Sequence, residues 1–143
     1  MKIEFEENNK KQILEASEEA VEKALEIIGL QCENYARNNA PEETGLLRNS
    51  ITSAVGGKGT SITTYIADKP KPHRQNKGFY SGIADKEEQP YVVIGSNVEY
   101  APYQELGTSR INPCNEGRGF LRPAVLDHID EFSRILKNEL ENG

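Results

Sequence analysis

The chain of 143 residues has the length of one domain, and its composition already excludes several classes of protein. Hydrophobic residues make up 36% of it, below the usual ~45–50% of a globular domain, and Trp is absent. That balance predicts a small core or a core completed by neighbouring copies. The net charge of −6 opposes stable binding of nucleic acid by the surface as a whole, since an acidic protein gains no affinity from counterion release.

The charge is unevenly distributed along the chain. Residues 1–39 contain nine acids and five bases, and residues 124–143 contain five acids and two bases. Residues 69–90 reverse the balance, with five bases and three acids. The two cysteines, Cys32 and Cys114, indicate reduced thiols. With no signal-peptide pattern and no apolar run of the ~18 residues that a membrane helix needs, we expect a soluble protein made in a cytoplasm.

The first 40 residues predict a short strand and then a long helix. Residues 2–6 alternate polar and apolar side chains, as a half-exposed strand does. Beyond Asn9, a helix-capping residue, apolar side chains recur at helical steps for about 30 residues. Pro41 should end the helix near Ala40, because it disfavours helical geometry in the preceding residue. We favour packing of this helix across a sheet over a coiled-coil seam. Its apolar stripe comprises Leu14, Val21, Leu25, Ile28, Cys32 and Tyr35.

The middle of the chain predicts a small antiparallel sheet. Residues 56–59, which are rich in glycine, predict a hairpin turn between the first two strands. Residues 69–90 hold prolines, glycines and many charges, and we expect a long flexible loop there. The expected strands are residues 50–55, 61–67 and 91–95.

The last third of the chain predicts two helices. The first covers residues 99–106, with Pro102 tolerated in its first turn and Gly107 ending it. The second opens at Pro123 and repeats apolar residues every three or four positions to the end of the chain. Together the elements predict a single domain, residues 1–143, with its long helix laid across a sheet.

Catalytic and metal-binding patterns are missing from the sequence. Neither His73 nor His128 has a serine or cysteine placed by a motif to act as a nucleophile. Cys114 and His128 lack the further ligands that a zinc site needs. Residues 56–59 lack the spacing of a phosphate-binding loop. We therefore expect no enzyme activity, no cofactor and no bound metal.

A basic patch in the segment 69–90 leaves two interpretations open. It comprises Lys69, Lys71, Arg74 and Lys77, and Phe79 and Tyr80 follow it. Basic residues beside aromatic ones can hold a nucleic-acid backbone, which would make the chain a small DNA-binding or DNA-processing factor. The patch can equally be a loop that docks a partner protein by opposite charge.

Three stretches resemble the motifs of one protein family. They are residues 40–51 (APEETGLLRNSI), residues 100–108 (YAPYQELGT) and residues 120–124 (FLRPA). The family is that of tail-component, head–tail joining or tail-completion proteins of long-tailed bacteriophages and prophages. The chain departs from the family pattern at Gly119, where a proline is usual, and in the segment 69–90, which is enlarged.

The resemblance implies a fold and a function. The fold is α+β, with a long N-terminal helix packed on a small antiparallel sheet, a short helix and a C-terminal helix. The function is that of a structural virion protein, made in the bacterial host cytoplasm and assembled as a ring that joins the capsid portal-connector to the tail tube. Its partners would be further copies of itself and neighbouring connector and tail proteins, without a membrane, while DNA passes without tight binding.

The matched motifs also supply candidate structural and interface residues. These are Thr44, Gly45, Arg48, Tyr100, Tyr103, Glu105, Gly107, Thr108, Phe120 and Pro123. Tyr100 and Tyr103 are of the type enriched at interfaces. Arg48 and Glu105 are each a lone charge inside an apolar motif, so we predict that they pair.

Overall fold

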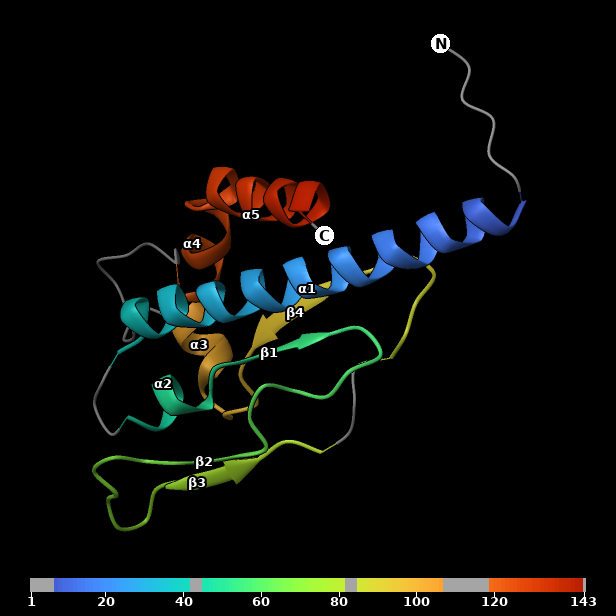
Figure 1. Ribbon diagram of the computed structural model, residues 1–143. Helices are drawn as coiled ribbons and strands as arrows, with labels where there is room; N and C mark the ends of the chain where they lie inside the picture. Colours follow the sequence, from blue (N-terminus) through green and yellow to red (C-terminus); the bar gives the residue numbers. More distant parts are fainter. Residues whose placement is uncertain (1–6, 42–44, 82–84, 107–118, 143) are drawn as a thin grey trace.

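A helix of 33 residues, α1 (Glu7–Asn39), lies across the strands, and the C-terminal helices pack on its other side (Figure 1). This computed structural model describes residues 7–41, 45–81, 85–106 and 119–142, and for residues 7–17 it describes the backbone alone. The predicted α+β fold is confirmed: the long helix packs on small antiparallel sheets, and short helices and a C-terminal helix complete the structure. The predicted strand at residues 2–6 lies outside the described residues.

Small side chains form the buried face of α1. Gly29 marks the closest approach to the sheet, because a Cβ there would lie 2.8 Å from the Ser53 hydroxyl and 3.1 Å from Val92. Leu25 and Ile28, which we predicted to belong to the buried apolar stripe, are half-buried. Close packing of helix on sheet thus replaces burial of large side chains. The small buried residues of this face are Ala20, Ala24, Gly29, Cys32 and Ala36, and the buried Ala40 follows the end of the helix.

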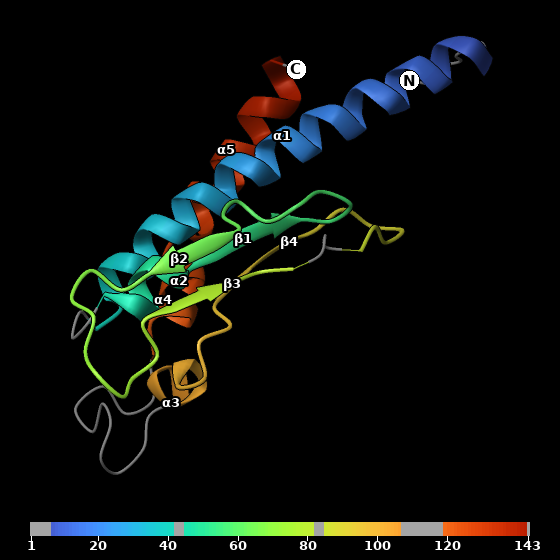
Figure 2. The same ribbon diagram turned by 90° about the horizontal axis from the view of Figure 1, so that it is seen from below.

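The strands form two separate antiparallel pairs. Strand β1 (Thr52–Val55) pairs with β4 (Val92–Gly95), and this sheet lies directly under α1. Strand β2 (Thr64–Ile66) pairs with β3 (Lys77–Phe79) in a hairpin on the far side of that sheet from α1 (Figures 1 and 2). Strand β3 therefore lies inside the segment 69–90, which we had expected to be a loop throughout.

The hairpin predicted for residues 50–55 and 61–67 forms only next to its turn. Farther from the turn the two segments pair with other strands. Pairing starts at Ala54 and Thr60 and at a 2.9 Å hydrogen bond from the Ser61 N–H to the Ser53 carbonyl. The Thr52 hydroxyl then accepts the Ile62 N–H at 3.3 Å, in place of a backbone carbonyl. Side chains that bond to backbone in this way compete with a sheet ladder, and the chain leaves β1 at that point.

A short helix, α2 (Leu46–Ser50), occupies the approach to β1, where we expected extended chain. Gly45 precedes it in the left-handed conformation, with φ 80°. That conformation agrees with the use of a glycine where the chain reverses after α1. Asn49 of α2 donates to the Ile66 carbonyl at 2.8 Å and to the Asp68 carboxylate at 3.0 Å, which ties α2 to the hairpin.

Replacing Gly45 by alanine should destabilise the protein by about 2 kcal/mol, because a non-glycine residue is strained at this φ. The added Cβ would also lie 2.6 Å from the Asp68 carboxylate. Gly59→Ala is the matched control, since nothing lies within 4 Å of a Cβ there. Urea unfolding of both variants checks this, and equal midpoints for the two would contradict it.

Among the residues described after β4 there are three helices: α3 (Ala101–Leu106), α4 (Leu121–Leu126) and α5 (Ile129–Asn142). The single helix predicted from Pro123 onward is interrupted at Asp127 and His128. Helices α4 and α5 pack on α1, where the rings of Tyr35 and His128 stack at 3.5 Å. Within the described ranges, we find no helix with the length and apolar character to cross a membrane.

Candidate interaction surface

The three motif stretches that are far apart in the sequence meet in one buried cluster. Leu46 and Ile51 come from the first stretch, Ala101 from the second, and Phe120 and Ala124 from the third. Phe120 is 1% exposed, and Leu46, Ile51 and Ala124 are 0% exposed. The motifs therefore build the core, and only parts of them reach the surface.

Glu105 joins two of these stretches through its carboxylate. One oxygen accepts the backbone N–H groups of Phe120 and Leu121, both at 2.8 Å, and the other accepts the N–H of Arg122 at 2.9 Å. These N–H groups belong to the start of α4, where a helix has no internal acceptors. Glu105 thus caps α4 from α3, in the manner of a side-chain N-cap supplied from another element.

The prediction that Arg48 pairs with Glu105 is wrong, because the partner of Glu105 is Arg122. The guanidinium of Arg122 lies 2.9 Å from the Glu105 carboxylate and also donates to the Glu105 carbonyl at 2.6 Å. Burial raises the pKa of Glu105, but hydrogen bonds from the α4 backbone and from Arg122 outweigh it and hold the pKa below its usual value. The carboxylate is therefore ionised near neutral pH.

Gly119 explains the departure from the family pattern before Phe120. Its φ is 76°, and an added Cβ would lie 2.3 Å from the Glu105 carboxylate. A proline cannot adopt this positive φ. The turn in this chain therefore uses a glycine so that the Glu105 carboxylate can approach the backbone.

The other motif residues are distributed between the core and the surface. Tyr100 is half-buried against the core, while Tyr103 is 56% exposed on α3. Pro123 lies in the first turn of α4, as expected. The remaining three members of the set, Thr44, Gly107 and Thr108, lie outside the described residues.

Sequence reasoning missed a buried carboxylate on α1. Glu33 is 3% exposed and accepts the Ser53 N–H of β1 at 2.6 Å and the Ser61 hydroxyl. Arg37, one turn along the helix, lies 3.6 Å from it and donates to the Ile51 carbonyl at 3.0 Å. Glu33 falls among the small residues Gly29, Cys32 and Ala36 at helical spacing, which was the signal available in the sequence.

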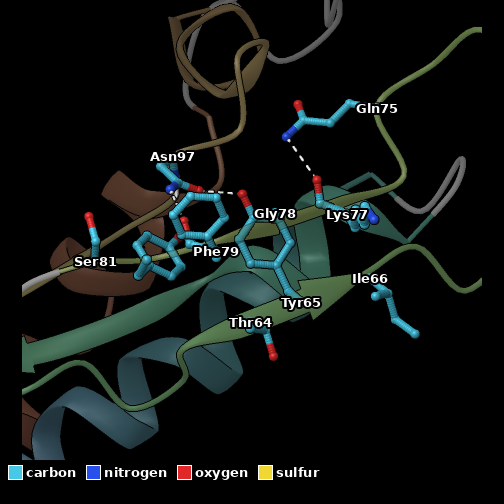
Figure 3. A pocket seen from close by; sticks show the side chains of 10 residues that line it. Thr64, Tyr65, Ile66, Gln75, Lys77, Gly78, Phe79, Ser81 and Asn97 are labelled. Atoms are coloured by element: carbon cyan, nitrogen blue, oxygen red, sulfur yellow. Dashed lines mark hydrogen bonds between the residues drawn. The ribbon is translucent and has the colours of Figure 1, made fainter.

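Asn97 is a second residue that sequence reasoning missed. It follows β4 and receives the Tyr65 hydroxyl of β2, while its own amide nitrogen donates to the Phe79 carbonyl of β3 at 2.8 Å (Figure 3). The Tyr80 hydroxyl accepts the Asn97 N–H at 3.2 Å and donates to the Ser50 carbonyl. Burial raises the pKa of both tyrosines, which remain protonated donors. The β2–β3 hairpin is therefore fastened to the core sheet.

Comparison with models of known protein families shows which family matches the chain. The model of one family, described as "Bacteriophage HK97-gp10, putative tail-component", matches residues 4–107. The chain belongs to this family. No curated protein and no solved structure matches the chain. The predicted resemblance to phage tail components is thereby confirmed, and membership of a structural tail-component family implies a non-enzymatic role.

In this HK97-gp10-like protein the two most exposed large apolar residues among those described lie on the β2–β3 hairpin. Ile66 and Phe79 are each 67% exposed, although both are large apolar residues. The basic residues Lys69, Lys71, Arg74 and Lys77 are all exposed on the same hairpin and its turn. The hairpin combines apolar area with positive charge, a composition typical of a protein-binding surface.

The residues weighed for catalysis and metal binding lie apart. His73 is exposed in the turn between β2 and β3, and His128, between α4 and α5, stacks on Tyr35. Cys114 is outside the described residues. Among the residues that the structure describes, no three histidine, cysteine or acidic side chains gather as metal ligands. Burial, together with the neighbouring Glu33 charge, raises the pKa of Cys32 to about 11, so this thiol stays protonated.

Proposed function

We propose that this tail component acts at the head–tail junction of a long-tailed phage, as a ring that joins the capsid portal-connector to the tail tube. Membership of the HK97-gp10-like family is the observation that carries the proposal. Its partners are then further copies of the chain and neighbouring connector and tail proteins. The protein is made in the host cytoplasm and ends in the virion.

The charge of the chain supports a ring through which DNA passes. A net charge of −6 leaves little counterion release to hold DNA in a lumen. The terminal segments carry most of the excess acid. Among the side chains that the structure describes, Glu18, Glu19 and Glu26 of α1 and Asp130 and Glu141 of α5 are exposed. We expect these side chains to supply the negative field of the lumen. Tight, salt-sensitive binding of duplex DNA by the purified protein would contradict the sliding role.

Imaging of particles tests the junction role. Phage or an induced prophage with the gene deleted should yield filled heads and separate tails in negative stain, and a plasmid copy of the gene should restore joined particles. Antibody labelling of the complemented particles should place the protein at the neck. Joined, infectious particles without the gene would overturn the proposal, and so would labelling confined to the tail tip.

The basic hairpin keeps the DNA-binding factor as a second candidate. Lys77 and the exposed Phe79 both lie on β3. A basic side chain near an exposed aromatic ring is a combination that binds single-stranded nucleic acid. This candidate predicts salt-sensitive binding of an oligonucleotide that weakens in Phe79→Ser. The junction role predicts no such binding.

A further inference from the structure

Two surfaces of this chain have complementary chemistry and lie far apart on it. The first is the basic hairpin, defined as β2, β3 and their turn, with Lys69, Lys71, Arg74 and Lys77 around Ile66 and Phe79. The second is an acidic groove between α1 and residues 86–91. One surface is basic and the other acidic, so the hairpin of one copy has the charge opposite to that of the groove of the next.

The hairpin presents its apolar side chains on a fixed frame. In the pairing of β2 with β3, Tyr65 lies opposite Gly78, and a Cβ at Gly78 would be 2.2 Å from the Tyr65 hydroxyl. That face is buried, so Ile66 and Phe79 point to the other face and remain exposed. Asn97 holds both strands to the core, as described above. Because the strand backbone is held in this way, little backbone entropy should be lost when the hairpin binds.

The turn of the hairpin is also ordered by its own hydrogen bonds. The Asn76 side chain accepts the Lys71 N–H at 2.9 Å and donates to the Lys71 carbonyl at 2.9 Å. The Ala67 N–H donates to the Asn76 carbonyl at 2.7 Å, which closes the turn next to β2. Lys69, Lys71 and Arg74 therefore sit on a shaped turn next to Ile66, and Lys77 lies opposite Ile66 on β3.

The acidic groove has an apolar floor and an acidic rim. Val21, Val55 and Tyr91 contribute the floor, and the groove has a volume of about 210 Å³. A cavity of ~150 Å³ is large enough to hold a benzene ring, so one aromatic side chain fits. Lys86 is the one base among the lining residues, whose acids are Glu18, Glu22, Glu87 and Glu88.

Some of this acidic charge is balanced within the chain. Lys58 lies 3.7 Å from Glu22 and 2.5 Å from Glu26, both on α1. Glu18, Glu87 and Glu88 are exposed on the two sides of the groove. The rim therefore keeps a negative field after this pairing, and that field attracts a basic partner over about a Debye length, ~8–10 Å at physiological salt.

The two surfaces cannot meet within one copy. Figures 1 and 2 both place the turn of the hairpin at one end of the molecule and residues 85–91 toward the other. Contacts between different patches of identical subunits are heterologous, and they propagate head to tail until a ring closes or a filament grows. Each added copy brings one hairpin and one groove, as such an assembly requires.

We propose that the basic hairpin of one copy docks in the acidic groove of the next, with Phe79 in the groove and the hairpin lysines against its acidic rim. This inference rests on the proposed ring and assigns its subunit contact. The basic hairpin is then a contact between copies of the chain, in place of one with a neighbouring connector or tail protein.

Reciprocal charge reversal tests the contact in the full-length protein. One variant carries Lys69→Glu and Lys77→Glu on the hairpin, and the other carries Glu18→Lys and Glu88→Lys on the groove. All four positions are exposed, so both variants should fold, which circular dichroism checks. Sedimentation velocity at millimolar concentration and low salt should show wild-type oligomers and, for each variant alone, association weakened about tenfold or more.

An equimolar mixture of the two variants is the decisive sample. Each hairpin then meets a groove of opposite charge on the other variant, so alternating oligomers should return. Arg134→Glu with Lys137→Glu is the matched control, because it makes the same charge change on exposed positions of α5 and should leave association unchanged. Phe79→Ser should weaken association in low and high salt alike, since its contribution is apolar.

The outcomes separate the contact from the junction role. Wild-type protein that stays monomeric, a mixture that fails to associate, or variants that associate normally would each overturn the contact. Hairpin variants that self-associate normally but lose DNA binding or binding of a neck protein would assign the hairpin to that other partner. Normal heads joined to tails in the absence of the gene would overturn the junction role and leave the contact standing.

Discussion

Glu105→Ala should lower the free energy of unfolding by about 3 kcal/mol, because it removes one acceptor group from several donors at once. The carboxylate binds three backbone N–H groups at the start of α4 and the Arg122 guanidinium. A hydrogen bond to a charged group contributes a net ~1.5–3 kcal/mol. The total loss should be smaller than the sum of these bonds, because water can reach the exposed donors once the carboxylate is removed. Urea unfolding at neutral pH measures the loss.

Two further variants separate the parts of this site. Glu105→Gln keeps one carbonyl acceptor and should lose about half as much. Arg122→Ala removes the ion pair and the hydrogen bond to the Glu105 carbonyl but leaves the backbone cap. Because the guanidinium side is 47% exposed, it should cost about 1 kcal/mol or less. If Glu105→Ala were no more harmful than Arg122→Ala, the backbone cap would not carry the stability.

The same carboxylate predicts a pH dependence. The pKa of Glu105 is lower in the folded protein than the ordinary value of 4.5, so the unfolded state binds the proton more readily. The stabilisation is therefore complete above about pH 4.5 and is lost as the pH falls through the folded pKa. The stability difference between wild type and Glu105→Gln should shrink over that range. A difference that stays constant down to pH 3 would contradict the charge as its cause.

The helices were largely predictable because their signals are local. The end of α1 at Asn39 follows from Pro41, and its length follows from the recurrence of apolar residues. The buried face was less predictable, because Ala20, Ala24 and Ala36 carry little hydrophobic signal in the sequence and are buried through close approach of the sheet. The periodicity of the apolar residues predicted the helix, but it also predicted that Leu25 and Ile28 are more buried than they are in the structure.

Strand pairing could not be read from neighbouring segments. The glycines at 56–59 predict a turn, and the turn exists, but Thr52 and Ser61 divert the returning chain through their hydroxyls. The actual partner of β1 is β4, about 40 residues away, and nothing local specifies that pairing. Two separate strand pairs therefore arise where one continuous sheet was expected.

The candidate site shows the same division. The motifs indicated that Glu105 is a lone charge in an apolar setting, but the arginine that it binds is Arg122 and not the predicted Arg48. The sequence does not show whether Arg48 or Arg122 is the partner of Glu105, because the pairing depends on how α3 lies relative to α4. Gly119 was visible as a departure from the family pattern, and its reason became clear only with the carboxylate that approaches it.

Glu33→Ala should be the most harmful single change at a polar residue, with a loss of about 3–5 kcal/mol. Removal of one partner from a buried charged cluster leaves the others without compensation. The Ser53 N–H of β1 and the Ser61 hydroxyl would lose their acceptor, and Arg37 would lose its counterion, all under α1. Chemical unfolding at neutral pH measures the loss.

Glu26→Ala on the same helix is the matched control. It has the same helix-propensity change, but the Glu26 side chain is 47% exposed and pairs with Lys58 at the surface, so little stability should be lost. Glu33→Gln should fall between the two, because it keeps an acceptor for the Ser53 N–H and loses the charge that faces Arg37. Equal unfolding midpoints for Glu33→Ala and Glu26→Ala would show that water replaces the carboxylate. In that case the bond between α1 and β1 would rest on the close packing at Gly29, and Gly29→Ala would become the more harmful change.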